Sequence, residues 1–187
     1  MASLIGSYSL SFGLFLSVFI IFFSVRNLRD TEILDKKIIS FTFTQFFFVV
    51  TSFFGLIISF VNSDFSNETV FNHSHTTKPL FYKISGTWGN HEGSLLLWLL
   101  VLTLFISIFL IKSSQQPKNY RIFTLLFQQI IIIGFFIFLI KTSSPFNYIF
   151  PTPNEGLGLN PILQDPALAI HPPILYLGYV GSSIIFS

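Results

Sequence analysis

The chain has 187 residues, of which 51% are hydrophobic and only 10% are charged. Soluble domains carry about 25% charged residues, so this composition argues against a soluble fold and predicts a membrane protein. The net charge of +2 is too small for the dense basic surface of a nucleic-acid-binding protein, and the absence of cysteine excludes disulfides, zinc–thiolate sites and thiol nucleophiles.

Four stretches of the chain predict membrane-spanning helices, because each has about twenty mostly apolar residues and no charged residue or histidine. These stretches are residues 4–25, 38–61, 93–111 and 122–140. A fifth apolar stretch, 173–187, would reach only about 22 Å as a helix, short of the roughly 30 Å hydrocarbon core. We therefore expect either an N-terminal fragment completed by another polypeptide, which we favour, or a re-entrant last helix.

The predicted fold is thus an all-α polytopic helix bundle, a single membrane domain over 1–187 with four full transmembrane helices and the start of a fifth. The basic residues predict its orientation, because they gather on the inner side of a membrane. Seven of them follow the first and third spans (Arg26, Arg29, Lys36, Lys37, Lys112, Lys118 and Arg121), and three follow the second and fourth (Lys78, Lys83 and Lys141). The long segments 62–92 and 142–172, which contain all four histidines, should therefore lie on the outer side.

The first outer segment begins with a Ser-, Thr- and Asn-rich run that carries His73 and His75. A pair of histidines at this spacing can bind a metal ion, but no third ligand is nearby. We therefore expect 62–78 to be a solvated, poorly ordered loop rather than a metal site.

The same segment then becomes glycine-rich around Trp88, which predicts a tight turn at the membrane surface. Asn90 is placed to cap the following helix, and Glu92 would lie in its first turn, where a carboxylate favours the helix dipole. Considered alone, Trp88 is best explained as an anchor at the membrane interface. Considered alone, His91 is best explained as a hydrogen-bonded surface residue rather than a ligand.

The second outer segment contains Asn160-Pro161 and Asp165-Pro166, and each pair is typical of a helix start. Short helices lying along the membrane interface are therefore expected here. His171 precedes Pro172, which disfavours helical backbone, so we expect it to be extended, with the two prolines opening the fifth span. An imidazole fixed there could ligate haem iron, and a capping or interfacial histidine is an equal alternative.

The segments WGNHEGSLLLW (88–98) and NPILQDPALAIHPPILYLGYVG (160–181) resemble the N-terminal part of the cytochrome c maturation protein F (CcmF) family. Members of this family are haem lyase subunits in bacteria and in some mitochondria. The resemblance implies that haem is held at the outer face by two histidines beneath a W-W-D segment, where its vinyl groups react with apocytochrome thiols. By position, His171 would be the first of these ligands, and Trp88, His91 and Glu92 would shape the outer surface; no catalytic acid or base is assigned.

The resemblance also implies the partners and the location of the chain. No W-W-D segment occurs in it, so a second chain would carry that segment and the remaining ligands and would share the haem. A haem chaperone, apocytochrome c and membrane lipid would be the other partners, in a mitochondrial or bacterial inner membrane. Such a fragment is not expected to be an active enzyme alone. The rival hypothesis is a structural subunit of a larger inner-membrane assembly without haem, whereas a transporter is disfavoured because the spans contain no charge.

Overall fold

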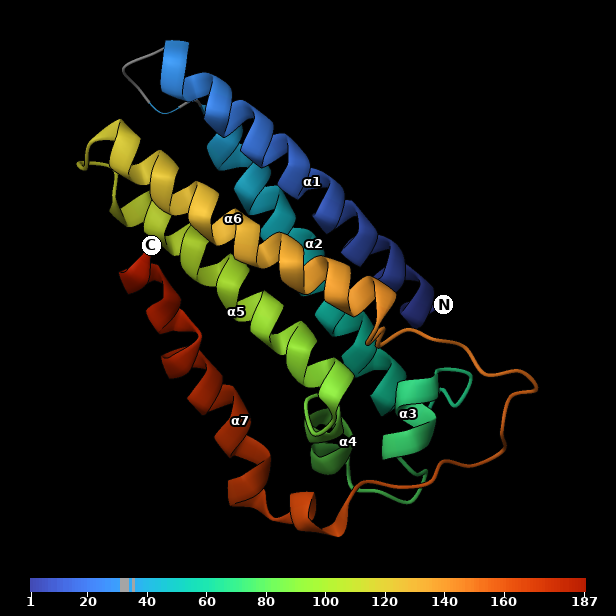
Figure 1. The fold of residues 1–187 in the computed structure, drawn as a ribbon. Coiled ribbons are helices and arrows are strands. Elements are labelled where there is room, and N and C mark those ends of the chain that lie inside the picture. Colours follow the sequence, from blue (N-terminus) through green and yellow to red (C-terminus); the bar gives the residue numbers. More distant parts are fainter. Residues whose placement is uncertain (31–33, 35) are drawn as a thin grey trace.

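The computed structural model describes residues 1–30, 34 and 36–187, and the elements found in these residues are all helices. Two antiparallel pairs form the body of the fold: α1 (Ala2–Asp30) with α2 (Lys36–Val61), and α5 (His91–Lys112) with α6 (Lys118–Lys141). Helix α1 packs on both α2 and α6, and α2 packs on α5, so the pairs close into a four-helix bundle (Figure 1). The prediction of an all-α polytopic bundle is confirmed.

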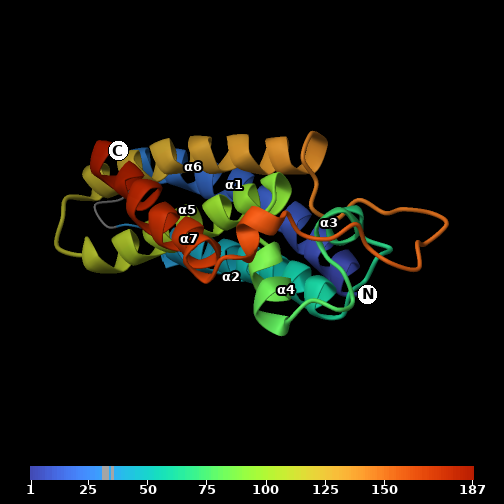
Figure 2. The same ribbon diagram turned by 90° about the horizontal axis from the view of Figure 1, so that it is seen from below.

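The fifth span begins earlier than the sequence predicted. Helix α7 (Pro166–Tyr179) is followed by the 3₁₀ helix η2 (Gly181–Phe186), and together they give a candidate span of 21 residues. By length and composition this stretch is a fifth candidate span, and its helix begins seven residues before the 173–187 stretch that the sequence predicted. It runs along one edge of the bundle, where α7 and η2 both contact α5 (Figure 2).

The segment 62–78 is folded, contrary to the expectation of a poorly ordered loop. It contains α3 (Glu68–His73), whose N-cap is Asn67: the side-chain oxygen accepts from the amide of Val70 at 3.0 Å. The amide nitrogen of the same side chain donates to the carbonyl of Pro145 at 2.9 Å. One buried asparagine therefore both starts a helix and ties it to the other outer segment, a long-range contact that a local sequence pattern does not reveal.

Hydrogen bonds join the two long segments 62–92 and 142–172 to each other. The amide of Leu157 donates to the carbonyl of Phe71 at 2.8 Å, and both the amide and the hydroxyl of Thr76 donate to the carboxylate of Glu155. These hydrogen bonds from Thr76 hold the pKa of Glu155 at about 2, below its ordinary value. Both segments lie at the end of the bundle where the chain begins, because alternate connections of the antiparallel helices share one end (Figure 1).

A buried polar cluster joins three helices inside the apolar bundle. Gln45 of α2 donates to Ser17 of α1, and Gln129 of α6 donates to the side-chain oxygen of Gln45 at 2.9 Å. All three side chains are buried. Because polar groups in a bilayer must find partners within the protein, this cluster favours one register of α1, α2 and α6 over alternatives.

Candidate functional site

The candidate site lies where α4 (Leu80–Gly86) meets the first turns of α5 and α7, at the end of the bundle at which the chain begins (Figure 1). The turn between α4 and α5 is held by Asn90, whose side-chain oxygen accepts from the amide of Gly93 at 2.7 Å. Its side-chain nitrogen donates to the carbonyl of Gly86, also at 2.7 Å. The predicted N-cap role of Asn90 is confirmed, and Glu92 lies in the first turn of α5 as expected.

Gly93 is required by a close approach of two backbone segments. A Cβ atom at this position would lie 1.6 Å from the carbonyl oxygen of Thr87, which is part of the backbone and cannot rotate away. Gly93 therefore allows the start of α5 to pack directly on the backbone of the preceding turn.

Replacing Gly93 with alanine should destabilise the outer end of α5 by roughly 3 kcal/mol or more, the upper range for overpacking against a rigid neighbour. Thermal unfolding of the variant in mild detergent checks this. The matched control is Gly134→Ala in α6, where an added Cβ meets nothing within 4 Å and alanine favours the helix. If the two variants unfold at the same temperature, the close approach at Gly93 does not constrain the fold.

The indole of Trp88 replaces a hydrogen bond that α7 cannot make by itself. In a helix, the amide of residue 173 would donate to the carbonyl of Ala169, but Pro173 has no N–H. Trp88 Nε1 donates to that carbonyl at 2.8 Å. The indole also stacks on Phe53 of α2, with ring centroids 6.5 Å apart. The first motif is thereby joined to α7 two residues before His171.

A second attachment lies two turns further along α7, at Tyr176. Its ring packs edge-on against Trp98, with centroids 5.3 Å apart, and its hydroxyl donates to Ser94 Oγ at 3.4 Å. Ser94 in turn donates to the carbonyl of Trp88 at 2.7 Å. Residues 88–98 therefore contact α7 at Ala169 and at Tyr176, and these two contacts fix the position of α7 relative to α5.

His171 lies inside α7, so the expectation that Pro172 forces it into extended backbone is wrong. The helix already starts at Pro166, because the Asp165 carboxylate caps it by accepting from the amides of Ala167 and Leu168 at 2.8 and 3.1 Å. Pro172 and Pro173 then fall in its interior rather than at its start. The Trp88 indole supplies one of the two donors that these prolines remove.

The imidazole of His171 faces away from the bundle. Ala169 is 4% exposed and lies against the indole of Trp88, and two residues later the helix has turned by about 200°. His171 is accordingly exposed, and it has no hydrogen-bond partner among the described residues. Its helical neighbours at spacings of three and four, Leu168, Ile174 and Leu175, are also exposed, between 43% and 64%.

The other outer residues singled out from the sequence do not join His171 directly. His91 is exposed and its ring packs edge-on against Phe138 of α6, with centroids 6.3 Å apart. Glu92 is half-buried, and its Oε2 atom has no hydrogen-bond partner within the described part of the chain. Of Trp88, His91 and Glu92, only Trp88 forms a hydrogen bond to α7 among the described residues.

The two histidines of the first outer segment have local partners. His73 Nδ1 lies 3.0 Å from the carbonyl of Thr69, and His75 Nδ1 lies 2.9 Å from Thr77 Oγ1. Across residues 1–30, 34 and 36–187, no three His, Asp or Glu side chains gather in a way that could hold a metal ion.

Sequence reasoning missed Ser94, Ala169 and Tyr176, which hold the two motifs together. One signal was present in the sequence: consecutive prolines in a helix leave two carbonyls without donors, and a tryptophan in the other motif can supply one. Nothing in the sequence identifies which carbonyl it reaches.

Comparison with known proteins finds a matching family model and several similar proteins. Residues 88–187 match the family model for cytochrome c assembly proteins. Over 184 residues the chain is 45% identical to the cytochrome c-type biogenesis protein CycK of Bradyrhizobium diazoefficiens, covering 97% of this chain and 28% of that protein. Over 148 residues it is 40% identical to CcmF of Escherichia coli, covering 79% of this chain and 23% of that one.

A solved structure shows the same fold. The structure described as cytochrome c haem lyase CcmF matches 98% of this chain and 29% of its own, with a TM-score of 0.78 and 26% identity. The chain thus spans less than a third of the length of these relatives. The identity to CycK also extends over α1 and α2, beyond the two motifs that carried the resemblance in the sequence.

Proposed function

Because the chain belongs to the cytochrome c assembly protein family, we propose that it is the haem-handling N-terminal part of a cytochrome c haem lyase. In this proposal the lyase attaches haem to apocytochrome c at the outer face of the membrane. The observation that carries the proposal is His171: its imidazole is exposed on the outward face of α7, while the opposite face is fixed to residues 88–98 through Trp88.

The surroundings of His171 suit haem as a substrate. An iron ligand needs a ring nitrogen that is not already engaged, and His171 has no partner among the described residues. A porphyrin face needs apolar contacts, and Leu168, Ile174 and Leu175 are exposed within one helical turn of the imidazole. One histidine and one apolar strip would form only one side of a haem site, and the residues of the other side would lie outside the 187 residues described by this sequence.

The work of these residues is positioning. His171 would hold the haem iron, the apolar strip would limit water, and Trp88 would keep α7 from shifting away from α5. Haem itself supplies the vinyl groups that react with the two thiols of the apocytochrome. We assign no acid or base in this chain, and Glu92 and His91 have the lesser role of shaping the outer surface between α4, α5 and α6.

The remainder of the proposed lyase lies outside these 187 residues. The chain corresponds to 28% of the length of CycK, and the family pattern places the W-W-D segment and the other haem ligands in the remainder. The exposed face of α7 is where that remainder would meet these residues. A haem chaperone would deliver haem to the joint site, and apocytochrome c would receive it there.

The proposed location is a mitochondrial inner membrane, or the inner membrane of a bacterium, with the two outer segments facing away from the matrix or cytoplasm. Because the chain has no cysteine, single-cysteine variants can test this orientation without background. Thr152→Cys, in the exposed loop before α7, should react with a membrane-impermeant maleimide from the outer side. Ser114→Cys, between α5 and α6, should react only after the membrane is permeabilised, and the reverse pattern would overturn the orientation.

Depleting the chain from its own cell or organelle tests the proposed function. We expect apocytochromes c to accumulate without covalently bound haem, while haem synthesis and cytochromes b remain, and expression of the unaltered chain should restore haem attachment. Normal haem attachment in fully depleted membranes would refute the proposal.

A further inference from the structure

The fifth span, Pro166–Phe186, is packed less tightly than the other four. Of its most apolar window 17% is buried inside the protein, against 33 to 50% for the other spans. Of the residues of α7, which are all described, only Ala169 is buried. Helices in a bilayer gain no hydrophobic energy by leaving lipid, so packing and hydrogen bonds hold them together. A span with so little packing therefore depends on its hydrogen bonds to the bundle.

Two of these hydrogen bonds attach the outer half of the span. The Trp88 indole donates to the carbonyl of Ala169, and the Tyr176 hydroxyl donates to Ser94. Further along the span, a cavity of about 150 Å³ separates it from the bundle. The cavity lies between Trp98 and Leu102 of α5, Ile131 and Phe135 of α6, and Tyr179 of the span. The outer attachments therefore do not continue into the inner half.

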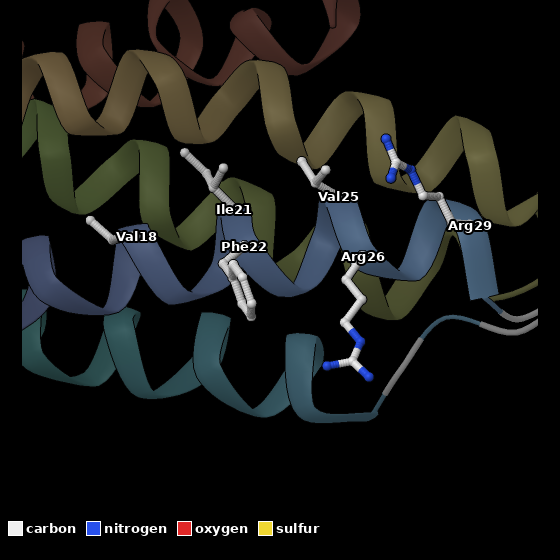
Figure 3. Close-up of a pocket in the computed structure, with 6 residues that line it drawn as sticks. All are labelled: Val18, Ile21, Phe22, Val25, Arg26 and Arg29. Atoms are coloured by element: carbon white, nitrogen blue, oxygen red, sulfur yellow. The ribbon is translucent and has the colours of Figure 1, made fainter.

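The inner half of the span is hydrogen-bonded to α6 through Gln128. The side-chain nitrogen donates to Ser183 Oγ at 3.2 Å and to Ser187 Oγ at 2.6 Å, and the side-chain oxygen accepts from Ser183 Oγ at 3.4 Å. Gln128 is fully buried. The last turns of the span lie beyond α6 as seen from α1 (Figure 3), where they contact α5 and α6.

Gly181 brings the same part of the span against α5. A Cβ atom at this position would lie 2.6 Å from the ring of Phe105, so the backbone of η2 rests directly on that ring. An apolar contact of this kind sets a distance, whereas hydrogen bonds also set a direction. Gln128 is therefore the residue that can fix how the inner half is oriented.

We propose that Gln128 is a positioning residue, which fixes the tilt of the fifth span and thereby the place of His171. The Tyr176 contact lies between them, about 7.5 Å from His171 and about 10.5 Å from Ser183 along the helix. If the span pivots at Tyr176, a displacement of about 2 Å at Ser183 moves His171 by about 1.4 Å in the opposite direction. The consequence for haem rests on the proposed function, whereas the tilt of the span does not.

The first test measures the tilt without haem. Gln128→Met removes the hydrogen bonds at nearly the same side-chain volume. Spin labels at Ala167→Cys in α7 and Ile137→Cys in α6, both exposed positions, report the distance between the two helices in the complete haem-free assembly in lipid nanodiscs. We expect Gln128→Met to shift the mean distance by about 1 to 2 Å. An unchanged distance would overturn the proposal, whether or not the assembly binds haem.

The second test uses the haem-loaded assembly. Gln128→Met should lower haem retention by about 10- to 100-fold per assembled complex, the range for residues that orient a metal ligand, although His171 is still present. The absorption spectrum measures this loss. A normal spectrum together with a shifted distance would overturn the link from Gln128 to His171. If the unaltered assembly holds no haem at His171, the proposed function fails, and the distance measurement still decides whether Gln128 sets the tilt.

Matched variants separate positioning from a general loosening of the bundle. Gln129→Met removes a buried amide one residue further along α6, but Gln129 bonds to Gln45 rather than to the fifth span. It should keep both the distance and the spectrum. The variant S183A/S187A removes the partners of Gln128 and should reproduce Gln128→Met, with little further effect when the changes are combined. Equal shifts in the Gln128 and Gln129 variants, or fully additive effects, would contradict the proposal.

Discussion

Replacing His171 with alanine should abolish haem ligation at the outer face, while the chain itself still folds and assembles. The imidazole is exposed and contributes no hydrogen bond among the described residues, so its removal costs the fold little. Loss of a residue that merely orients a metal ligand already lowers metal affinity by about 10- to 100-fold, so loss of the ligand itself should lower haem retention at least as much. The absorption spectrum of the purified assembly measures this loss.

Two comparisons make the His171 result specific. His75→Ala, in the first outer segment, should leave the spectrum unchanged, because His75 pairs with Thr77 and Glu155 far from α7 in the chain. His171→Gly should behave like the alanine variant, and added imidazole should restore part of the spectrum by occupying the vacant ligand position. An unchanged spectrum in His171→Ala would remove the residue from the haem site.

Replacing Trp88 with phenylalanine should loosen α7 and weaken haem binding without removing any haem ligand. Phenylalanine keeps a ring to stack on Phe53 but has no N–H, so the buried carbonyl of Ala169 loses its donor. Leaving such a group unpaired costs about 1–3 kcal/mol. Hydrogen exchange over 166–179 should accelerate about 5- to 150-fold, and this readout does not depend on haem.

A double-mutant cycle with Pro173 isolates that hydrogen bond. Pro173→Ala gives α7 its own amide donor for Ala169, so Trp88→Phe should cost much less in that background. We expect a coupling of about 1–2 kcal/mol between the two positions, within the usual range for directly interacting residues. Additive effects would mean that Trp88 acts on α7 through packing alone.

The spans and the helix cap at Asn90 were predictable because their causes are local. An uncharged, apolar run of about twenty residues has few alternatives to a membrane helix. The side chain of Asn90, in extended backbone, accepts from the amide of Gly93 three residues later and so caps the helix from within the same short segment. The shared side of the two long segments was also predictable, because alternate connections of an up-and-down bundle must lie at the same end.

The conformation of His171 was not predictable because a distant residue decides it. The rule that a residue before proline avoids helical backbone is a local preference, whereas Asp165 starts the helix earlier and Trp88, about eighty residues away, replaces a missing donor. For the same reason, segment 62–78 looked like a loop: the partners of Asn67 and Thr76 are Pro145 and Glu155, in the other outer segment. Polar composition alone does not show such partners.

A structure of the complete haem-loaded assembly that contains this chain tests the proposed role of His171 most directly. We expect a ring nitrogen of His171 to coordinate the haem iron, Leu168 or Ile174 to contact the porphyrin, and the Trp88 indole still to donate to the carbonyl of Ala169. An assembly whose outer surface holds no haem, with His171 hydrogen-bonded to protein or water, would contradict it and would identify the chain as a structural subunit instead.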